Sequence, residues 1–218
     1  MDLFGHPFSS YTWKALIALY ENDTPFTFRR LGPDQPETSA EFHRRWPIAK
    51  FPLLVDGDRQ VMEATAIVEY LDAIHPGPVR LIPADPRLAV EVRMMDRIFD
   101  NYVMAPMQAP VADALRPADA NRDPHGVARA RDGLHRSYAW LDEALAGRHW
   151  ACGDAFTLAD CAAAPALFYA DWVEPIPGDY GVLKSYRARL LARPSVARVV
   201  DEARPYRAFF PLGAPDRD

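Results

Sequence analysis

The hydrophobic pattern of the chain changes at a proline-rich interval, and this change limits what the chain can fold into. Pro76-Gly77-Pro78 is followed by Pro83 and Pro86, and such punctuation is typical of a linker. Before the interval, strand and helix signals alternate. After it, nearly every apolar stripe has helical spacing. We therefore predict one domain over residues 1–76, a linker over 77–87 and an all-helical domain over 88–218.

Short strand patterns alternate with helical patterns in the first domain. A crossover between parallel strands is right-handed, so the first two strands should be parallel, and the closing hairpin makes the four-stranded sheet mixed. The predicted order is βαβ-α-ββα. The strands are expected at residues 3–4, 26–28, 51–55 and 60–62, and the helices at 11–22, 37–46 and 67–74.

The second domain contains long amphipathic patterns. One apolar stripe contains Val92, Met95, Phe99 and Tyr102, at helical spacing. Residues 157–160 (TLAD) match a capping box, which predicts that a helix begins there. The helix that follows is apolar on most sides, so we expect it at the centre of the domain.

Composition and charge exclude several functions. Lys and Arg number 25 against 30 Asp and Glu, a net charge of −5, which argues against a nucleic-acid partner. The longest apolar run, residues 162–170, is too short to span a bilayer, and no signal-peptide pattern is present. The two cysteines, Cys152 and Cys161, form no C-x-x-C motif, and Cys161 is expected in the core. We expect a reduced, cytoplasmic protein without a membrane or nucleic-acid partner.

Pro52 opens the strand predicted at residues 51–55. If the Phe51–Pro52 bond is cis, the amide and carbonyl of Phe51 turn outward and can pair with an added extended peptide. An ordinary proline at a sheet edge would explain the same residues.

Glu63 lies where a strand passes into a helix. The amides of Ala64 and Thr65 would then form an anion site, and Glu63 could hold an ammonium group. Together these would suit the end group of an α-amino acid. The alternative is that Glu63 only complements the helix dipole.

Two hydroxyl residues, Ser9 and Ser10, lie where the first strand hands over to the first helix. Serine commonly caps a helix there. A hydroxyl at a positive helix end can also donate a hydrogen bond to a thiolate.

Together, these three segments resemble the cytosolic glutathione S-transferase family, over essentially the whole chain. Residues 46–57 (WPIAKFPLLVDG) are similar to the family's cis-proline stretch, and residues 63–71 (EATAIVEYL) to its "E-S-x-A-I-x-x-Y-L" stretch. Residues 153–160 (GDAFTLAD) look like its helical-domain capping box. The resemblance implies a thioredoxin-like domain followed by an all-helical domain. It also implies a homodimer and an enzyme that uses glutathione as co-substrate without a metal.

The resemblance assigns roles to particular residues. Ser9 matches the catalytic position, and Ser10 and Tyr11 are the next candidates to supply the catalytic hydroxyl. For glutathione binding, Phe51 would pair with the cysteinyl part, and Glu63 with the Ala64 amide would hold the γ-glutamyl end. Lys50, with His43, would neutralise the glycyl carboxylate. The full glutathione set is Ser9, Lys50, Phe51, Pro52, Glu63, Ala64 and Thr65. The expected electrophile pocket contains Phe8, Tyr11, Met95, Phe99 and Tyr102, with Phe209 and Phe210 as further walls.

The chain departs from the family pattern at several positions, so alternatives stay open. Ala64 replaces the family's serine, which removes one contact to the γ-glutamyl carboxylate and gives weight to a non-catalytic binding or scaffold protein. Residues 9–19 (SSYTWKALIAL) are partly similar to the zeta-class stretch, which includes maleylacetoacetate isomerases. Ser9 stands where a redox-active member would carry cysteine, so thiol–disulfide exchange at that position is excluded.

Overall fold

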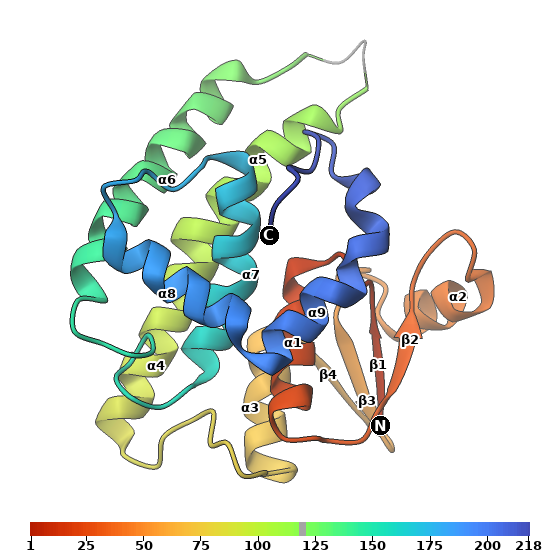
Figure 1. The fold of residues 1–218 in the computed structure, drawn as a ribbon. Helices are drawn as coiled ribbons and strands as arrows, with labels where there is room; N and C mark the ends of the chain where they lie inside the picture. The colour runs from red at the N-terminus through yellow and green to blue at the C-terminus, as the bar shows by residue number, and fades with distance from the viewer. Residues whose placement is uncertain (118–120) are drawn as a thin grey trace.

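The computed structural model describes residues 1–117 and 121–218 and shows a sheet-containing domain beside a helical one (Figure 1). The first domain follows the predicted order, so the thioredoxin-like fold and the helical second domain are both confirmed. Its strands are β1 (Asp2–Gly5), β2 (Thr27–Arg30), β3 (Leu53–Asp56) and β4 (Arg59–Met62). Its helices are α1 (Ser10–Glu21), α2 (Pro36–Arg45) and α3 (Ala64–Ile74).

The four strands form one mixed sheet in the order β2-β1-β3-β4. β1 pairs with β2 in parallel, with Leu3 opposite Phe28, as the crossover rule predicts. β3 is antiparallel to both β1 and β4. Successive side chains of a strand point to opposite faces of the sheet, and apolar side chains on both faces pack against helices. Leu3 and Leu54 join the core formed with α1 and α3, whereas Phe4 and Leu53 pack with Phe42 of α2 on the other face.

The second domain is built entirely from helical elements in the described residues. Its central helix, α7, is buried along its whole length, as expected, and the predicted capping box is present at its start. The Asp160 carboxylate there accepts from the Thr157 amide at 2.9 Å. The α-helices are α4 (Pro86–Ile98), α5 (Ala105–Ala114), α6 (Pro124–Ala144), α7 (Leu158–Val173), α8 (Gly181–Ala192) and α9 (Pro194–Ala203), with a π-helical turn η1 (Phe99–Met104) and a 3-10 helix η2 (Arg204–Phe209).

The junction between the domains differs slightly from the expected linker. Residues 75–85 contain neither helix nor strand, but Pro86 and Arg87 already belong to α4. The helix begins there because the Asp85 carboxylate caps it, accepting from the amides of Arg87 and Leu88. Cys161 is fully buried, as predicted. Within residues 1–117 and 121–218, the longest apolar helical stretch falls short of a membrane span.

A buried cluster of charges joins the two domains. The ammonium group of Lys14, on α1, is 1% exposed and forms ion pairs with Asp96 of α4 and Asp100 of η1, the latter at 2.8 Å. It also donates to the Thr65 hydroxyl at 2.7 Å. Arg97 pairs with both aspartates from the solvent side. Two positive and two negative groups thus compensate one another at the interface, as buried charges require.

Replacing Lys14 by methionine should destabilise the protein strongly. The change leaves the Asp96 and Asp100 carboxylates buried with one partner fewer, and breaking a buried ion pair costs about 3–5 kcal/mol. Urea unfolding at pH 7 measures this loss. Lys184→Met is the matched control, because Lys184 is exposed on α8 and the same change there should have little effect. Equal unfolding midpoints for the two variants would contradict the prediction.

Candidate active site

A cavity of about 410 Å³ lies where the two domains meet, at the start of α1. Its floor comes from the first domain and its walls from α5, α7 and the residues after η2. Aromatic and aliphatic side chains dominate the lining, and Lys50 supplies the one charged side chain among the described lining residues. The lining residues are Phe8, Ser9, Ser10, Tyr11, Ala49, Lys50, Phe51, Met107, Gln108, Val111, Leu115, Tyr169, Phe209, Phe210 and Pro211.

Ser9 caps α1, with its side chain facing this cavity. Its hydroxyl oxygen accepts from the Thr12 amide at 3.3 Å, and its backbone carbonyl accepts from the Trp13 amide at 3.0 Å. A serine hydroxyl carries one proton as well as its lone pairs, so capping does not use the proton. The positive end of the helix dipole adds to the local preference for negative charge. Ser9 can therefore cap the helix and donate to an anion at the same time.

The segment before β3 presents backbone groups to the same cavity. The Phe51–Pro52 bond is cis. In the described part of the chain, neither the amide nor the carbonyl of Phe51 takes part in a backbone hydrogen bond, so both are available to a ligand. Pro52 is buried beneath this edge and does not line the cavity. Lys50 is exposed beside it.

Glu63 begins α3 in an unusual backbone conformation. Its φ of 67° lies in the left-handed region, which is uncommon outside glycine and recurs at functional sites. Its carbonyl accepts the first helical bond, from Ile67 at 2.9 Å. The backbone amides that come before that of Ile67, at the start of α3, therefore have no partner within the helix. Ala49, in the wall near Phe51, also has a positive φ, of 58°.

A second cavity, of about 690 Å³, lies over this helix start. Glu63, Ala64, Thr65, Arg97 and Asp100 are among its lining residues. Tyr11 lines both cavities, so it lies between the Ser9 side and the Glu63 side of the site. The structure thus brings six of the seven predicted glutathione-binding residues together as two adjoining subsites, whereas the buried Pro52 lines neither cavity. Ser9, Lys50 and Phe51 belong to the first, and Glu63, Ala64 and Thr65 to the second.

The hydroxyl of Thr65 is already used by the protein itself. It accepts from Lys14 at 2.7 Å and donates to Asp96 at 3.1 Å in the buried charge cluster. Only its backbone amide therefore remains for a ligand. Ala64, 5% exposed, has no hydroxyl to offer either.

Only some of the residues expected to form the electrophile pocket lie near Ser9. Phe8 and Tyr11 line its cavity, as do Phe209 and Phe210. Met95 and Phe99 instead lie in the core, 3% and 0% exposed, because they face α7 and α8 across the helical domain. Tyr102 lines a different cavity. Met95, Phe99 and Tyr102 therefore do not line the cavity beside Ser9, contrary to the prediction.

Of the other wall residues, Met107 belongs to a methionine-rich stretch, residues 94–107, that the sequence offered as the lining of an apolar pocket, and the rest were not predicted. Met107, Gln108, Val111 and Leu115 follow one face of α5. Tyr169 of α7 donates from its hydroxyl to the Phe8 carbonyl at 2.9 Å, which fixes the loop before Ser9. The methionine-rich stretch that includes Met107 was the available signal for α5. The sequence contained no such signal for Tyr169, because an aromatic residue in an apolar helix is typical of a core.

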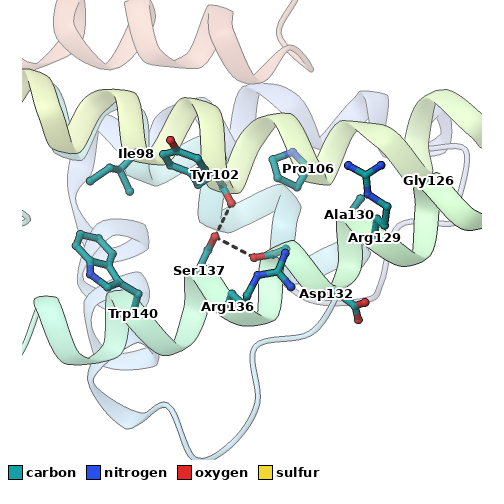
Figure 2. A pocket seen from close by; sticks show the side chains of 11 residues that line it. Ile98, Tyr102, Pro106, Gly126, Arg129, Ala130, Asp132, Arg136, Ser137 and Trp140 are labelled. Carbon is teal, nitrogen blue, oxygen red and sulfur yellow. Dashed lines mark hydrogen bonds between the residues drawn. The ribbon is translucent and has the colours of Figure 1, made fainter.

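A third cavity, of about 800 Å³, is a groove between α6 and the η1–α5 segment (Figure 2). Ile98, Tyr102, Pro106 and Trp140 line it, and Ser137 donates to the Tyr102 carbonyl at 2.7 Å. Tyr102 and Trp140 are 61% and 44% exposed. The groove contains none of the predicted glutathione-binding residues. Across residues 1–117 and 121–218, no group of acidic, histidine or cysteine side chains is arranged to hold a metal ion.

A thioredoxin-like domain whose first helix opens into a cavity against a helical domain defines the glutathione S-transferase architecture. Residues 3–79 match the model of the glutathione S-transferase N-terminal domain, and residues 124–189 match that of the C-terminal domain. Together the two matches span more than half of the chain. The protein belongs to the glutathione S-transferase superfamily.

Similar proteins include both enzymes and other members of this superfamily. A probable maleylacetoacetate isomerase from Vibrio cholerae is 28% identical over 222 residues, covering 93% of this chain and 96% of that protein. FtsZ-localized protein A from Caulobacter vibrioides is 27% identical, covering 88% and 87%. A crystal structure of a Methylobacterium radiotolerans glutathione S-transferase in complex with glutathione sulfonate has a TM-score of 0.78 and 29% identity, covering 91% and 93%.

The phenol of Tyr11, between the two cavities, should titrate above pH 10. Burial raises its pKa, and the nearby Asp100 carboxylate adds to this more than Arg97 opposes it. Tyr11 therefore stays protonated at neutral pH and can act only as a neutral donor. The difference in phenolate absorbance between the protein and a Tyr11→Phe variant measures this titration. A midpoint at or below pH 10 would show that the environment favours the phenolate instead.

Proposed function

We propose that the protein binds glutathione across the two adjoining cavities and transfers its thiolate to an apolar electrophile. The observation that carries the proposal is the position of Ser9. Ser9 lies at the start of α1, and among the described residues its hydroxyl proton has no acceptor and the backbone groups of Phe51 in the same cavity have no backbone partner. A cysteinyl group paired with Phe51 would bring its sulfur toward Ser9. The γ-glutamyl end would then lie at Glu63 and the first amides of α3.

The free energies involved are sufficient for thiolate formation. Lowering the thiol pKa by about 2 units requires roughly 2.7 kcal/mol of preferential thiolate stabilisation. One hydroxyl that donates to a charged group supplies about 1.5–3 kcal/mol. The positive end of the helix adds about 0.3–1 kcal/mol. Ser9 and α1 together account for the required stabilisation, and no general base is needed.

The walls of the Ser9 cavity indicate what kind of electrophile fits. Phe8, Tyr169 and Phe210 form a contiguous aromatic cluster, with Phe8 and Tyr169 5.5 Å apart edge to face. Aliphatic side chains of α5 cover the opposite side. Apolar surface of this kind stabilises an apolar co-substrate by burial.

Isomerisation of a maleyl dicarboxylate is a second candidate reaction, because the Vibrio cholerae relative covers nearly the whole chain. It would use the same thiolate but would require cations for two carboxylates. In the stretch that is partly similar to the zeta class, residues 9–19, Lys14 stands where the zeta-class pattern has an arginine. Its side chain is buried in the domain interface and lines neither cavity. The apolar walls therefore favour conjugation. Glutathione-dependent turnover of maleylacetone, with none of 1-chloro-2,4-dinitrobenzene, would reverse this preference. Turnover of neither would favour a binding protein.

Replacing Ser9 by alanine should raise the pKa of bound glutathione and slow conjugation. Losing one hydrogen bond to the thiolate, about 1.5–3 kcal/mol, corresponds to roughly a tenfold to hundredfold lower kcat at pH 7. Thiolate absorbance of the complex and the pH profile of 1-chloro-2,4-dinitrobenzene conjugation measure the two effects. The slower rate should recover as the pH rises, because hydroxide then removes the proton.

Ser10→Ala is the matched control for this experiment. Ser10 lies beside Ser9 in the same cavity, so a comparable loss in both variants would point to packing rather than thiolate stabilisation. An unchanged pH profile in Ser9→Ala, together with a shifted one in Ser10→Ala, would transfer the role to Ser10.

We further propose that two copies of the chain associate through the apolar groove between η1 and α6. Exposed Tyr102 and Trp140 lie there with Arg129, Arg136 and Asp132, so two copies of the groove offer charges of both signs to one another. Such a self-complementary surface suits a two-fold dimer. Exposed apolar patches of this kind commonly mark interaction sites.

Replacing Trp140 by glutamate should convert the dimer to a monomer. The change replaces a large apolar side chain in the groove by a carboxylate that would lose its hydration in the contact. Light scattering coupled to size-exclusion chromatography measures the mass. Leu212→Glu, at an exposed apolar residue outside the groove, should remain dimeric. A monomeric wild-type protein would overturn the proposed association.

A further inference from the structure

The last residues of the chain fold back onto η2. The Asp218 carboxylate accepts from Arg204 at 3.0 Å and also pairs with Arg207. Arg204 is held in turn by Asp201 of α9, at 2.8 Å. Because Asp218 bonds to a residue 14 positions earlier, residues 204–218 form a loop whose two ends are joined by ion pairs. We call these ion pairs the clasp.

A second anchor fixes the same segment to the helical domain. Arg217 pairs with the Asp171 carboxylate and donates to the Asp171 carbonyl at 2.8 Å. Asp171 lies near the end of α7, the helix that supplies Tyr169 to the Ser9 cavity. The clasp is thereby attached to the helix that forms part of the cavity wall.

The middle of the loop forms one wall of the Ser9 cavity. Phe210 is 6% exposed and packs edge to face against Trp172 at 5.2 Å. Phe209 is 66% exposed at the cavity mouth, beside Pro211. Arg207 of the clasp lies over the ring of Trp172, 5.2 Å from its centre. The clasp and the buried ring of Phe210 therefore share one support. The exposed ring of Phe209 lies beside Tyr206 of the same loop, 6.0 Å between ring centres, and beside His6 of the first domain, at 6.3 Å.

Building on the proposed function, we propose that the clasp fixes the aromatic wall for the electrophile. Phe209 and Phe210 are then specificity-determining residues for aromatic co-substrates. Asp218 is a positioning residue, because it acts on them through Arg204 and Arg207. Without the clasp, the wall would have to be ordered each time a ligand binds, which weakens binding of the aromatic part of the ligand. The glutathione part rests on residues of the first domain and does not depend on the wall.

Asp218→Asn tests this inference against Asp216→Asn. Both variants remove one negative charge from the same segment, but Asp216 is exposed and has no ion pair among the described residues. Calorimetric titration with S-benzylglutathione and with glutathione separates the two parts of the site. Asp218→Asn should weaken S-benzylglutathione binding by about threefold to tenfold, the cost of ordering one or two side chains, and leave glutathione binding unchanged. Asp216→Asn should change neither affinity.

Arg204→Gln and the double variant with Asp218→Asn complete a thermodynamic cycle. If the two residues act through one another, the loss of S-benzylglutathione affinity in the double variant is smaller than the product of the single losses. Independent, multiplicative losses would overturn the clasp. So would equal S-benzylglutathione affinities in Asp218→Asn and Asp216→Asn.

Hydrogen exchange separates failure of this inference from failure of the proposed function. Amides of residues 208–210 and 212 should exchange faster in Asp218→Asn than in Asp216→Asn, whether or not the protein binds glutathione. If the wild-type protein binds neither ligand, the proposed function fails, and the exchange rates alone decide on the clasp. Equal exchange in both variants would overturn it.

Discussion

Helix α1 is buried on two sides, and this constraint fixes where the site can be. One side packs on the sheet through the shared core, and Trp13 on the other contacts Phe168 of α7, with ring centres 4.9 Å apart. A helix enclosed in this way can present its backbone to a ligand only at an end. The C-terminal end of α1 turns toward β2, so the N-terminal end, with Ser9, faces the cavity. The packing of the two domains thus positions the Ser9 hydroxyl, on which the proposed chemistry rests.

The buried charge cluster makes the same packing specific. Lys14 lies one helical turn after the start of α1, and its partners Asp96 and Asp100 lie on the helical domain. A lysine ammonium group cannot be left there without carboxylates, because an unpaired buried charge is very unfavourable. Any displacement of the domains that separates these groups is therefore costly. Because Thr65 belongs to the same cluster, the start of α3 is held in register with the start of α1. The two subsites are coupled through the domain interface.

Much of the first domain could be predicted from local patterns, because its strands, turns and helix starts are encoded within a few residues of each other. The helical domain illustrates why the rest could not. The regular stripe Val92, Met95, Phe99 and Tyr102 predicts one buried face, but the π-helical turn η1 adds a residue to the helical repeat. Within this turn Val103 is buried and Tyr102 faces outward, and after it Met107 is buried. The buried position of Lys14 could not be predicted either, because its ion-pair partners Asp96 and Asp100 are more than 80 residues away in the chain. A single lysine in an amphipathic pattern normally indicates a solvated face.

Ser9 shows why a structural and a functional interpretation of one residue need not compete. From the sequence, capping of α1 and donation to a thiolate were alternatives for the same side chain. The geometry makes the two roles compatible, because the hydroxyl oxygen accepts from the Thr12 amide while its proton has no acceptor among the described residues. The capping bond restrains the side chain that would otherwise have to be ordered when a thiolate binds, and an ordered donor loses less entropy on binding. The structural role therefore strengthens the proposed chemical one, and a serine at a helix start that opens into a cavity combines both.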